Sequence, residues 1–174
     1  MNHRSDPAAC PTGENARLAL RAAFENGSAY GLLAFDGERA VGWCAVDPVA
    51  TQVGHDYFLH TPGGSDWMIH CLYVEESARG KGVSGALVEA AAALAKENMA
   101  ERILGFPIPE GSAGKFPKDL AEFSGRLSTF RKLGFEPRER LDDFYQVVAL
   151  QLSTWRVRTE PIVVRTLNSP GAQK

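Results

Sequence analysis

The order of segments between residues 67 and 108 constrains the fold more than any other feature of this sequence. Trp67–Val74 is apolar on both alternating faces, which is typical of a central strand that is covered on both sides. The alanine-rich segment that begins near Val83 has its apolar side chains at helical spacing, and Arg102–Ile108 is a second apolar segment. Two strands joined by a helix of this length run parallel in one sheet with a right-handed crossover. The sequence therefore predicts a mixed α/β domain.

Turn-forming residues divide the rest of the chain into short elements. The Asp36-Gly37 pair predicts a tight hairpin, and Gly134 suits the left-handed end of a helix. The expected helices are Asn15–Asn26 and Gly125–Lys132, and the expected strands are Tyr30–Phe35, Ala40–Val46, Glu136–Arg140, Tyr145–Leu152 and Pro161–Leu167. Residues 47–66 and 109–125 are expected to be long loops, which in a compact domain are usually functional. We expect one domain over residues 1–174, with loose tails at 1–14 and 168–174.

Composition narrows the classes of function. With 44% hydrophobic and 23% charged residues, the 174-residue chain has the composition of a soluble globular protein and not of a disordered one. A formal net charge of −2 gives no electrostatic attraction to nucleic acid or to anionic lipid. No apolar stretch approaches the ~20 residues of a membrane helix. Because the polar N-terminus lacks the apolar region of a secretory signal, the expected location is cytoplasmic.

The three cysteines, Cys10, Cys44 and Cys71, are widely spaced. They form no Cys-x-x-Cys pair, so the sequence predicts neither a zinc ribbon nor a redox motif. We expect reduced, buried thiols and no metal site.

The segment that carries the chemistry is the glycine-rich turn Arg79–Gly85, between the central strand and the long helix. Three glycines in six residues allow the backbone to turn tightly and to approach a ligand closely. The first amides of the helix that follows have no partner within the helix, and the helix dipole adds partial positive charge there. Together with the cations Arg79 and Lys81, they predict a site for a phosphate or pyrophosphate.

Two other phosphate-binding motifs fit this turn less well. Gly80-x-Gly82-x-x-Gly85 matches the dinucleotide fingerprint literally, and a nicotinamide-dependent oxidoreductase is therefore a minor alternative. In that motif, however, the first glycine follows the strand almost at once, and an acidic residue ends the next strand. Here five residues, Glu75–Arg79, lie between the strand and the first glycine. The next expected strand and its end, Arg102–Pro109, contain no acidic residue. A Walker loop also fails, because no Gly-Lys pair is followed by Ser or Thr.

The turn resembles motif A of the GNAT superfamily of acetyl-CoA-dependent N-acetyltransferases, whose pattern is Arg/Gln-x-x-Gly-x-Gly/Ala. Residues 79–84 match this pattern, except that Ser84 stands where the family prefers Gly or Ala. About fifty residues downstream, Phe130–Phe135 is similar to motif B of the same family. The resemblance covers roughly residues 30–152. Gly42-Trp43-Cys44, Ile108-Pro109 and Phe123-Ser124-Gly125 further resemble a bacterial branch whose acceptors are mostly unassigned.

This resemblance implies an α/β (α+β) fold with a mixed, centrally splayed sheet of about six to seven strands, flanked by helices. It implies acetyl-CoA as cosubstrate and an amine on a small molecule or protein as acceptor. The pantetheine arm is expected in the gap beside the bulged central strand, where a backbone N–H would face the developing oxyanion. The implied cofactor-binding residues are Leu72, Tyr73, Val74, Arg79, Gly80, Lys81, Gly82, Val83, Ser84, Gly85 and Phe130.

Direct transfer needs a base for the amine and a proton for the leaving thiolate. The candidate bases are His70, Asp47, Glu75, Glu76 and Glu110; by simple alternation His70 is expected to share a face with Met68 and Leu72. The family commonly uses a tyrosine four residues before the motif B glycine as the acid. Phe130 stands at that position here and cannot donate a proton. The candidate acids are therefore Ser128, Tyr145, Tyr73 or water.

The N-terminal part of the chain differs from the family pattern. The family fold begins with a strand, whereas the roughly thirty residues before Tyr30 show no clear strand. Either the chain starts late or a second copy covers that sheet edge, so a homodimer is expected as one possibility. The short N-terminus and Phe130 also leave open an alternative function, a catalytically weak acyl-CoA-binding regulatory module.

Overall fold

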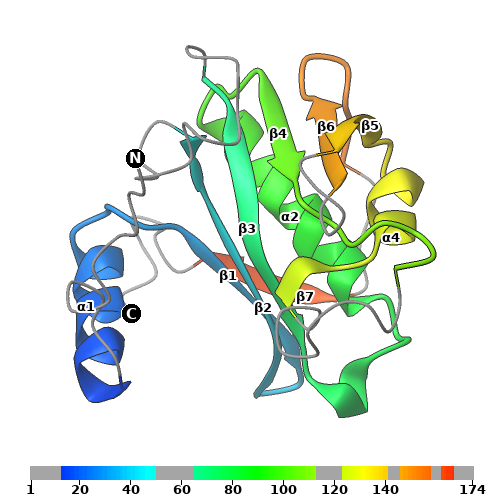
Figure 1. Ribbon diagram of the computed structural model, residues 1–174. Coiled ribbons are helices and arrows are strands. Elements are labelled where there is room, and N and C mark those ends of the chain that lie inside the picture. The colour runs from blue at the N-terminus through cyan, green and yellow to red at the C-terminus, as the bar shows by residue number, and fades with distance from the viewer. Residues whose placement is uncertain (1–12, 50–64, 113–122, 141–145, 158–161, 167–174) are drawn as a thin grey trace, which may run out of the picture.

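A computed structural model describes residues 13–49, 65–112, 123–140, 146–157 and 162–166 of the chain. Its centre is a mixed seven-stranded sheet with the strand order β5-β6-β4-β3-β2-β1-β7 (Figure 1). The strands are β1 (Gly31–Asp36), β2 (Arg39–Pro48), β3 (Trp67–Val74), β4 (Arg102–Gly105), β5 (Glu136–Arg140), β6 (Gln146–Gln151) and β7 (Val163–Thr166). The helices are α1 (Gly13–Glu25), α2 (Val83–Glu97) and α4 (Leu127–Lys132), with the short 3-10 turn η4 (Glu76–Ala78). This is the mixed sheet with flanking helices that the sequence predicts.

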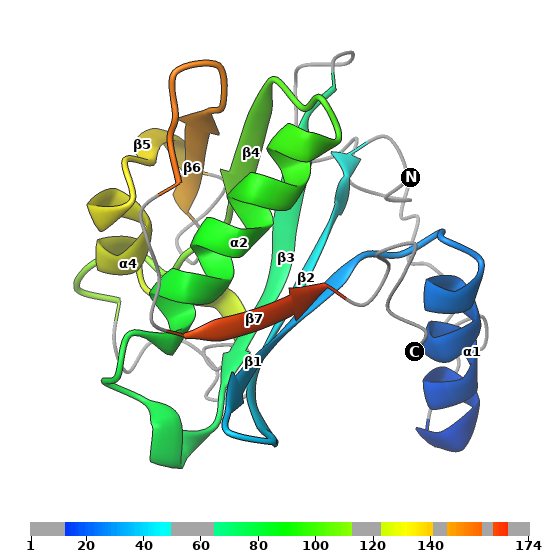
Figure 2. The ribbon, with the colours of Figure 1, turned by 180° about the vertical axis from the view of Figure 1, so that it is seen from behind.

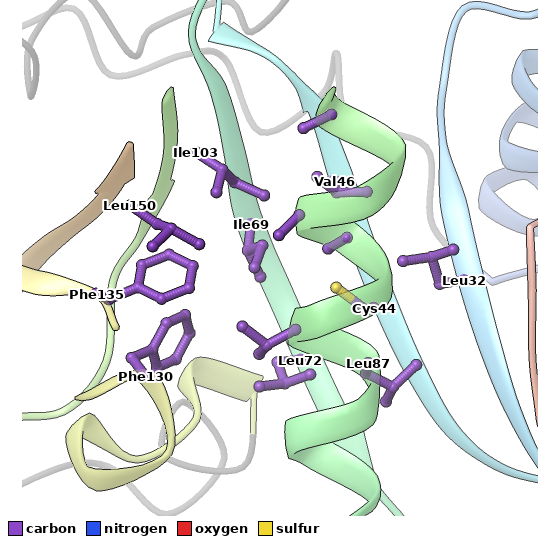
Figure 3. Packing of buried hydrophobic residues seen from close by; sticks show 14 of the residues in the cluster. Leu32, Cys44, Val46, Ile69, Leu72, Leu87, Ile103, Phe130, Phe135 and Leu150 are labelled. Carbon is purple, nitrogen blue, oxygen red and sulfur yellow. The ribbon is translucent and has the colours of Figure 1, made fainter. Parts of the chain in front are cut away.

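The unit β3–α2–β4 forms the middle of the molecule. β3 lies between β2 and β4 and pairs in parallel with β4, as the apolar pattern of Trp67–Val74 predicts. Helix α2 crosses one face of the sheet and buries its apolar stripe against it (Figure 2). Gly42 allows this close approach, because a Cβ there would lie 2.9 Å from side-chain atoms of Leu87 and Val83. The main core therefore lies between α2 and the sheet (Figure 3).

β3 and β4 are paired over only three positions. Trp67, Met68 and Ile69 pair with Ile103, Leu104 and Gly105, and no further β3–β4 pair follows. β3 continues to Val74 along β2, so its other edge separates from β4 beyond Ile69. The sheet is thus splayed at the C-terminal ends of its two central parallel strands. The predicted strand Arg102–Ile108 is correspondingly shorter and ends at Gly105.

The outer edge of β1 is covered by the chain's own C-terminal strand. β7 pairs antiparallel with β1 over Leu32–Phe35 and forms that edge of the sheet. In Figure 2, β7 also passes close to the start of α2. The chain therefore covers this edge of the sheet with its own strand, and the homodimer stays a prediction.

The remaining elements fall close to their expected positions, with one informative exception. The helix expected from Gly125 starts at Leu127, because Gly125 has a left-handed φ of 71° and Arg126 is extended and forms a bridge with Ile108. Within the described residues, no helix is long and apolar enough to cross a membrane.

Candidate active site

The glycine-rich turn leads directly into α2. Gly80 and Gly82 have left-handed φ values of 78° and 87°, which explains why both positions are glycine. Gly82 is the N-cap, and the first intrahelical bond runs from the Ala86 N–H to the Gly82 carbonyl. The amides of the three residues before Ala86 therefore lie at the open N-terminal end of α2. Among the described residues, a Cβ at Gly80 or Gly85 would meet no atom within 4 Å, and one at Gly82 would meet only Ile162, at 3.9 Å.

The two cations of the turn have different surroundings. The Arg79 Nε donates a hydrogen bond of 3.0 Å to the carbonyl of Val74, so this side chain ties the turn to the end of β3. Lys81 is exposed on the turn itself. Val83 is buried beneath the helix, and Ser84 is half-buried. The predicted phosphate site therefore has a backbone wall of glycines and helix amides with positive charge at its rim.

The exposed edge of β3 leads from the splay to this turn. The Glu75 N–H donates to the Val41 carbonyl, so Glu75 points its backbone groups toward β2. Because these directions alternate along an antiparallel strand, Tyr73 also faces β2, whereas Leu72 and Val74 direct their N–H and C=O groups into the gap. Of the three residues predicted to offer backbone groups, two are therefore oriented to do so.

The two ends of the expected loop at residues 109–125 meet on the other side of the gap. The Ile108 N–H donates to the Gly125 carbonyl at 3.3 Å, and Arg126 forms a parallel bridge with Ile108. A Cβ at Gly125 would come within 2.8 Å of the Leu72 side chain, so this backbone packs closely against β3. We did not anticipate this contact, although the glycine at 125 was the available signal for it.

The ring of Phe130 packs at the end of β4, where β3 and β4 separate. Its side chain is fully buried and packs edge-on against Phe135, with ring centroids 5.1 Å apart (Figure 3). Gly105 lies so close that a Cβ there would be 2.4 Å from the ring of Phe130. The prediction that Phe130 lies beside the CoA thiol stays a prediction; the structure places its ring between the last β4 residue and the Gly125 backbone.

The imidazole of His70 contacts a buried carboxylate. Its Nε2 lies 2.7 Å from Oδ2 of Asp47, and the other carboxylate oxygen accepts a hydrogen bond of 2.8 Å from the Tyr30 N–H. The side chain of Asp47 is 5% exposed and that of His70 is 30% exposed. The structure thus joins two of the five candidate bases, one from β2 and one from β3.

Simple alternation predicts that His70 shares a face of the sheet with Met68 and Leu72, and this prediction is wrong for Leu72. The register of β2 and β3 shifts between Ala45 and Val46, which pair with Cys71 and Ile69 and leave His70 as an extra residue. Leu72 therefore packs in the main core with Ile69, and only Met68 belongs to the small cluster on the opposite face. This bulge was the feature of the central strand that the sequence pattern did not locate.

The other candidate catalytic residues lie elsewhere or outside the described residues. Glu110 is exposed and accepts a hydrogen bond of 3.0 Å from Arg131 of α4, whereas His70 contacts β2. Ser128 is exposed on α4, on a different side of the helix from buried Phe130. Glu75 is 3.4 Å from Arg39, and Glu76 is exposed in η4. Tyr145 lies outside the described residues.

Aromatic side chains gather around Trp43 and Tyr73, near the C-terminal end of β3. Trp43 and Tyr73 are cross-strand neighbours, and Cys71 is close enough to share a hydrogen bond with Trp43. Phe123 stacks on Tyr73 at 5.6 Å, and Phe24 of α1 meets Trp43 edge-on at 5.8 Å. Trp67, in contrast, is a buried core residue against Tyr30.

A parallel strand pair that separates beside the N-terminus of a helix is a geometry suited to a ligand that carries phosphate groups. The chain matches the model of the acetyltransferase (GNAT) family over residues 2–108, well over half of its length. The protein therefore belongs to the GNAT family and is an acyltransferase of the N-acetyltransferase class. The glycine-rich turn lies within the matched residues, and Phe130–Phe135 lies beyond them.

Solved structures share the fold at low sequence identity. An N-acetyltransferase from Staphylococcus aureus Mu50 is 14% identical, with 86% of this chain and 85% of that chain covered and a TM-score of 0.56. The yncA protein from Salmonella typhimurium, solved with acetyl-CoA, is 15% identical over 81% and 75% of the two chains, with a TM-score of 0.55. The paia N-acetyltransferase from Thermoplasma acidophilum, solved with coenzyme A, is 13% identical over 80% and 71%, with a TM-score of 0.55. A comparison with curated proteins finds no match.

Proposed function

We propose that this protein transfers the acetyl group of acetyl-CoA to an amine. The observation that carries the proposal is that the splay of β3 and β4 and the glycine-rich start of α2 lie at the same end of β3. A ligand with a pyrophosphate at one end and a thioester at the other can therefore reach both features. Two structural neighbours carry acetyl-CoA or coenzyme A, which supports the same ligand here.

The residues of this chain fit the ligand. The positive φ of Gly80 and Gly82 and the open space above Gly80 and Gly85 leave the N-terminal amides of α2 accessible to a pyrophosphate. The gap-facing groups of Leu72 and the N–H of Val74 can bond a pantetheine amide as a neighbouring strand would, whereas the Val74 carbonyl already accepts a hydrogen bond from Arg79. When bound, the thioester supplies an activated acetyl group, and a β3 N–H directed into the gap would stabilise charge on its carbonyl oxygen.

The leaving thiolate does not require a dedicated acid from Phe130. That ring is fully buried and has no proton to donate. An ordinary thiol has a pKa of about 8.5, so a thiolate released at neutral pH takes a proton from water. Ser128 and Tyr145 stay proposals for that step. Glu110 is the weaker proposal for a base, because its carboxylate is exposed and bound to Arg131.

The test is acetyl-CoA turnover with a panel of primary amines that includes alkyl, arylalkyl and polyamine acceptors and peptides with free N-termini. Free thiol and the acetylated amine are both measured, so that simple hydrolysis is recognised. Transfer to at least one amine class in equal amount to thiol release is the expected result. Tight binding of coenzyme A without transfer to any amine would instead identify a CoA-binding regulatory module.

A further inference from the structure

We propose that His70 and Asp47 form a dyad in which His70 takes the proton from the acceptor amine and Asp47 positions its ring. This inference rests on the proposed function and identifies the base for it. Neither residue has an assigned role, and the sequence alone left five carboxylates and imidazoles as alternatives.

The bulge places His70 at the point where β3 and β4 separate. Ile69 is the last β3 residue that pairs with β4, and His70 is the next residue along the chain. Because His70 is the extra residue of the bulge, its side chain is directed to the sheet face opposite α2, where it meets Asp47. An acetyl group held in the gap would therefore have the imidazole beside it, on the face away from the cofactor's helix.

Asp47 fixes both the orientation of the ring and the position of its proton. Its two carboxylate oxygens have separate partners, the Tyr30 N–H and the His70 Nε2, so the carboxylate cannot rotate without losing one. A carboxylate accepts hydrogen bonds, so neutral His70 carries its proton on Nε2 and leaves Nδ1 as the acceptor. The partly exposed ring can thus accept a second proton at Nδ1 while the buried carboxylate bonds Nε2–H.

The proton balance of the reaction is complete with these groups. Nδ1 of His70 removes one proton from the ammonium form of the acceptor, and the freed lone pair attacks the thioester carbon. A C–N bond forms, the C–S bond breaks, and the nitrogen loses its second proton to the leaving sulfur through water. His70 then returns its proton to solvent, so the products are the amide, the free thiol and one proton.

The charged pairs near β3 lie far from His70 and Asp47 along the strand. The neighbouring thiol, Cys71, stays neutral. Asp66 and Arg102 pair at the start of β3, and Arg39 and Glu75 meet beyond its end. Burial raises the pKa of the neighbouring Cys71 thiol, which keeps it protonated, and Tyr73 stacks on Phe123. Among the described residues, Asp47 is therefore the one anionic group in contact with the His70 ring.

The experiment compares His70→Gln and Asp47→Asn with Asp66→Asn as the matched control. Asp66 is also a buried carboxylate, in an ion pair with Arg102 at the other end of β3, so Asp66→Asn measures the structural cost of such a loss. With the best amine of the panel, His70→Gln is expected to lower kcat about 100-fold or more while KM for acetyl-CoA changes less than about twofold. The fall of kcat/KM at low pH, where an imidazolium cannot accept a proton, should be absent in His70→Gln.

Asp47→Asn has a specific expected effect on the tautomer. The Tyr30 N–H still needs an acceptor, so the amide oxygen of the new side chain takes that place and its NH2 faces Nε2. Nε2 must then accept, and the proton moves to Nδ1, where it blocks the base. We expect kcat to fall at least tenfold, and the double variant to be no slower than His70→Gln alone.

The tautomer can be read without any acceptor. Nitrogen-15 NMR of the four histidines, with His70 assigned through His70→Gln, should show Nε2–H in the parent and Nδ1–H in Asp47→Asn. If no amine is acetylated, the proposed function fails, and the NMR result alone decides the dyad. The dyad is overturned by an Nδ1–H tautomer in the parent, by a His70→Gln kcat within threefold of the parent, or by equal losses in Asp47→Asn and Asp66→Asn.

Discussion

At the scale of single residues, the packing of Phe130 predicts how a tyrosine at that position would affect stability and activity. The Phe130 ring is fully buried against Gly105 and Gly125, and the sequence alone left open whether a hydroxyl there would serve as an acid. A phenolic hydroxyl in this packing would be desolvated with little room for a partner. We expect Phe130→Tyr to lower the free energy of unfolding by about 1–3 kcal/mol in urea titration and to leave kcat unchanged. A rise in kcat of tenfold or more would mean that the ring edge reaches the thiol.

A second residue-scale prediction concerns pH and the buried thiol of Cys44. Burial, then the charges of Cys71 and Asp47, raise the pKa of this thiol far above its ordinary value. The unfolded chain loses that proton above about pH 8.5, whereas the folded chain keeps it. The stability from the protonated thiol is therefore complete below pH 8.5 and falls as pH rises, by about 1.4 kcal/mol per unit.

Cys44→Ala is the comparison for this prediction. The variant should be less stable than the parent at pH 7, because a buried side chain is shortened, and the difference should shrink between pH 8.5 and 10. Urea titrations of both proteins at each pH measure it. A constant difference across that range would show that the folded thiol ionises as readily as the unfolded one.

At the scale of elements, the packing of α4 against β4 depends on one missing side chain. A Cβ at Gly105 would be 2.4 Å from the ring of Phe130, so the two positions are coupled. Gly105→Ala should lower the free energy of unfolding by about 1–3 kcal/mol through overpacking. Adding Phe130→Leu should recover part of that loss, although Phe130→Leu alone is destabilising. Strict additivity in the four-member cycle would contradict the contact.

The elements themselves were largely predictable from the sequence, because each depends on local pattern. The strand Trp67–Val74 has the predicted bounds, and the helix that follows begins at Val83 as expected. The Asp47–His70 contact was not predictable, because it depends on a one-residue shift in register between two strands. Period-two alternation carries no signal for such a bulge, so Leu72 was placed on the wrong face.

At the scale of the whole molecule, the sequence pattern could not predict the order of the strands in the sheet. The expected strand Pro161–Leu167 is present as β7 over Val163–Thr166, yet its pairing with β1 depends on contacts about 130 residues apart along the chain. Local patterns indicate that a segment is extended, and they say nothing about which edge it joins. The glycine-rich turn Arg79–Gly85 was predictable because all of its residues lie in one short segment.

This C-terminal strand yields a prediction about assembly. Removing residues 158–174 deletes β7 and leaves β1 with an unpaired edge. An unpaired edge strand is a template for pairing with another chain, so the shortened protein should be less stable and should self-associate. Light scattering and thermal unfolding of both forms measure this. A shortened protein that matches the parent in melting temperature and mass would show that β7 contributes nothing to that edge.

The central claim is that the N-terminal end of α2 holds the pyrophosphate of acetyl-CoA, and calorimetric titration of coenzyme A tests it most directly. The comparison is between Gly82→Val and Gly37→Val, because both glycines have a left-handed φ and neither has an atom of the described residues closer than 3.9 Å to its missing Cβ. The two variants carry a similar backbone strain, but only the one at position 82 would place a branched side chain at the helix amides. We predict that Gly82→Val loses coenzyme A binding and that Gly37→Val binds as the parent does. Equal affinity in both variants would contradict the assignment of this site.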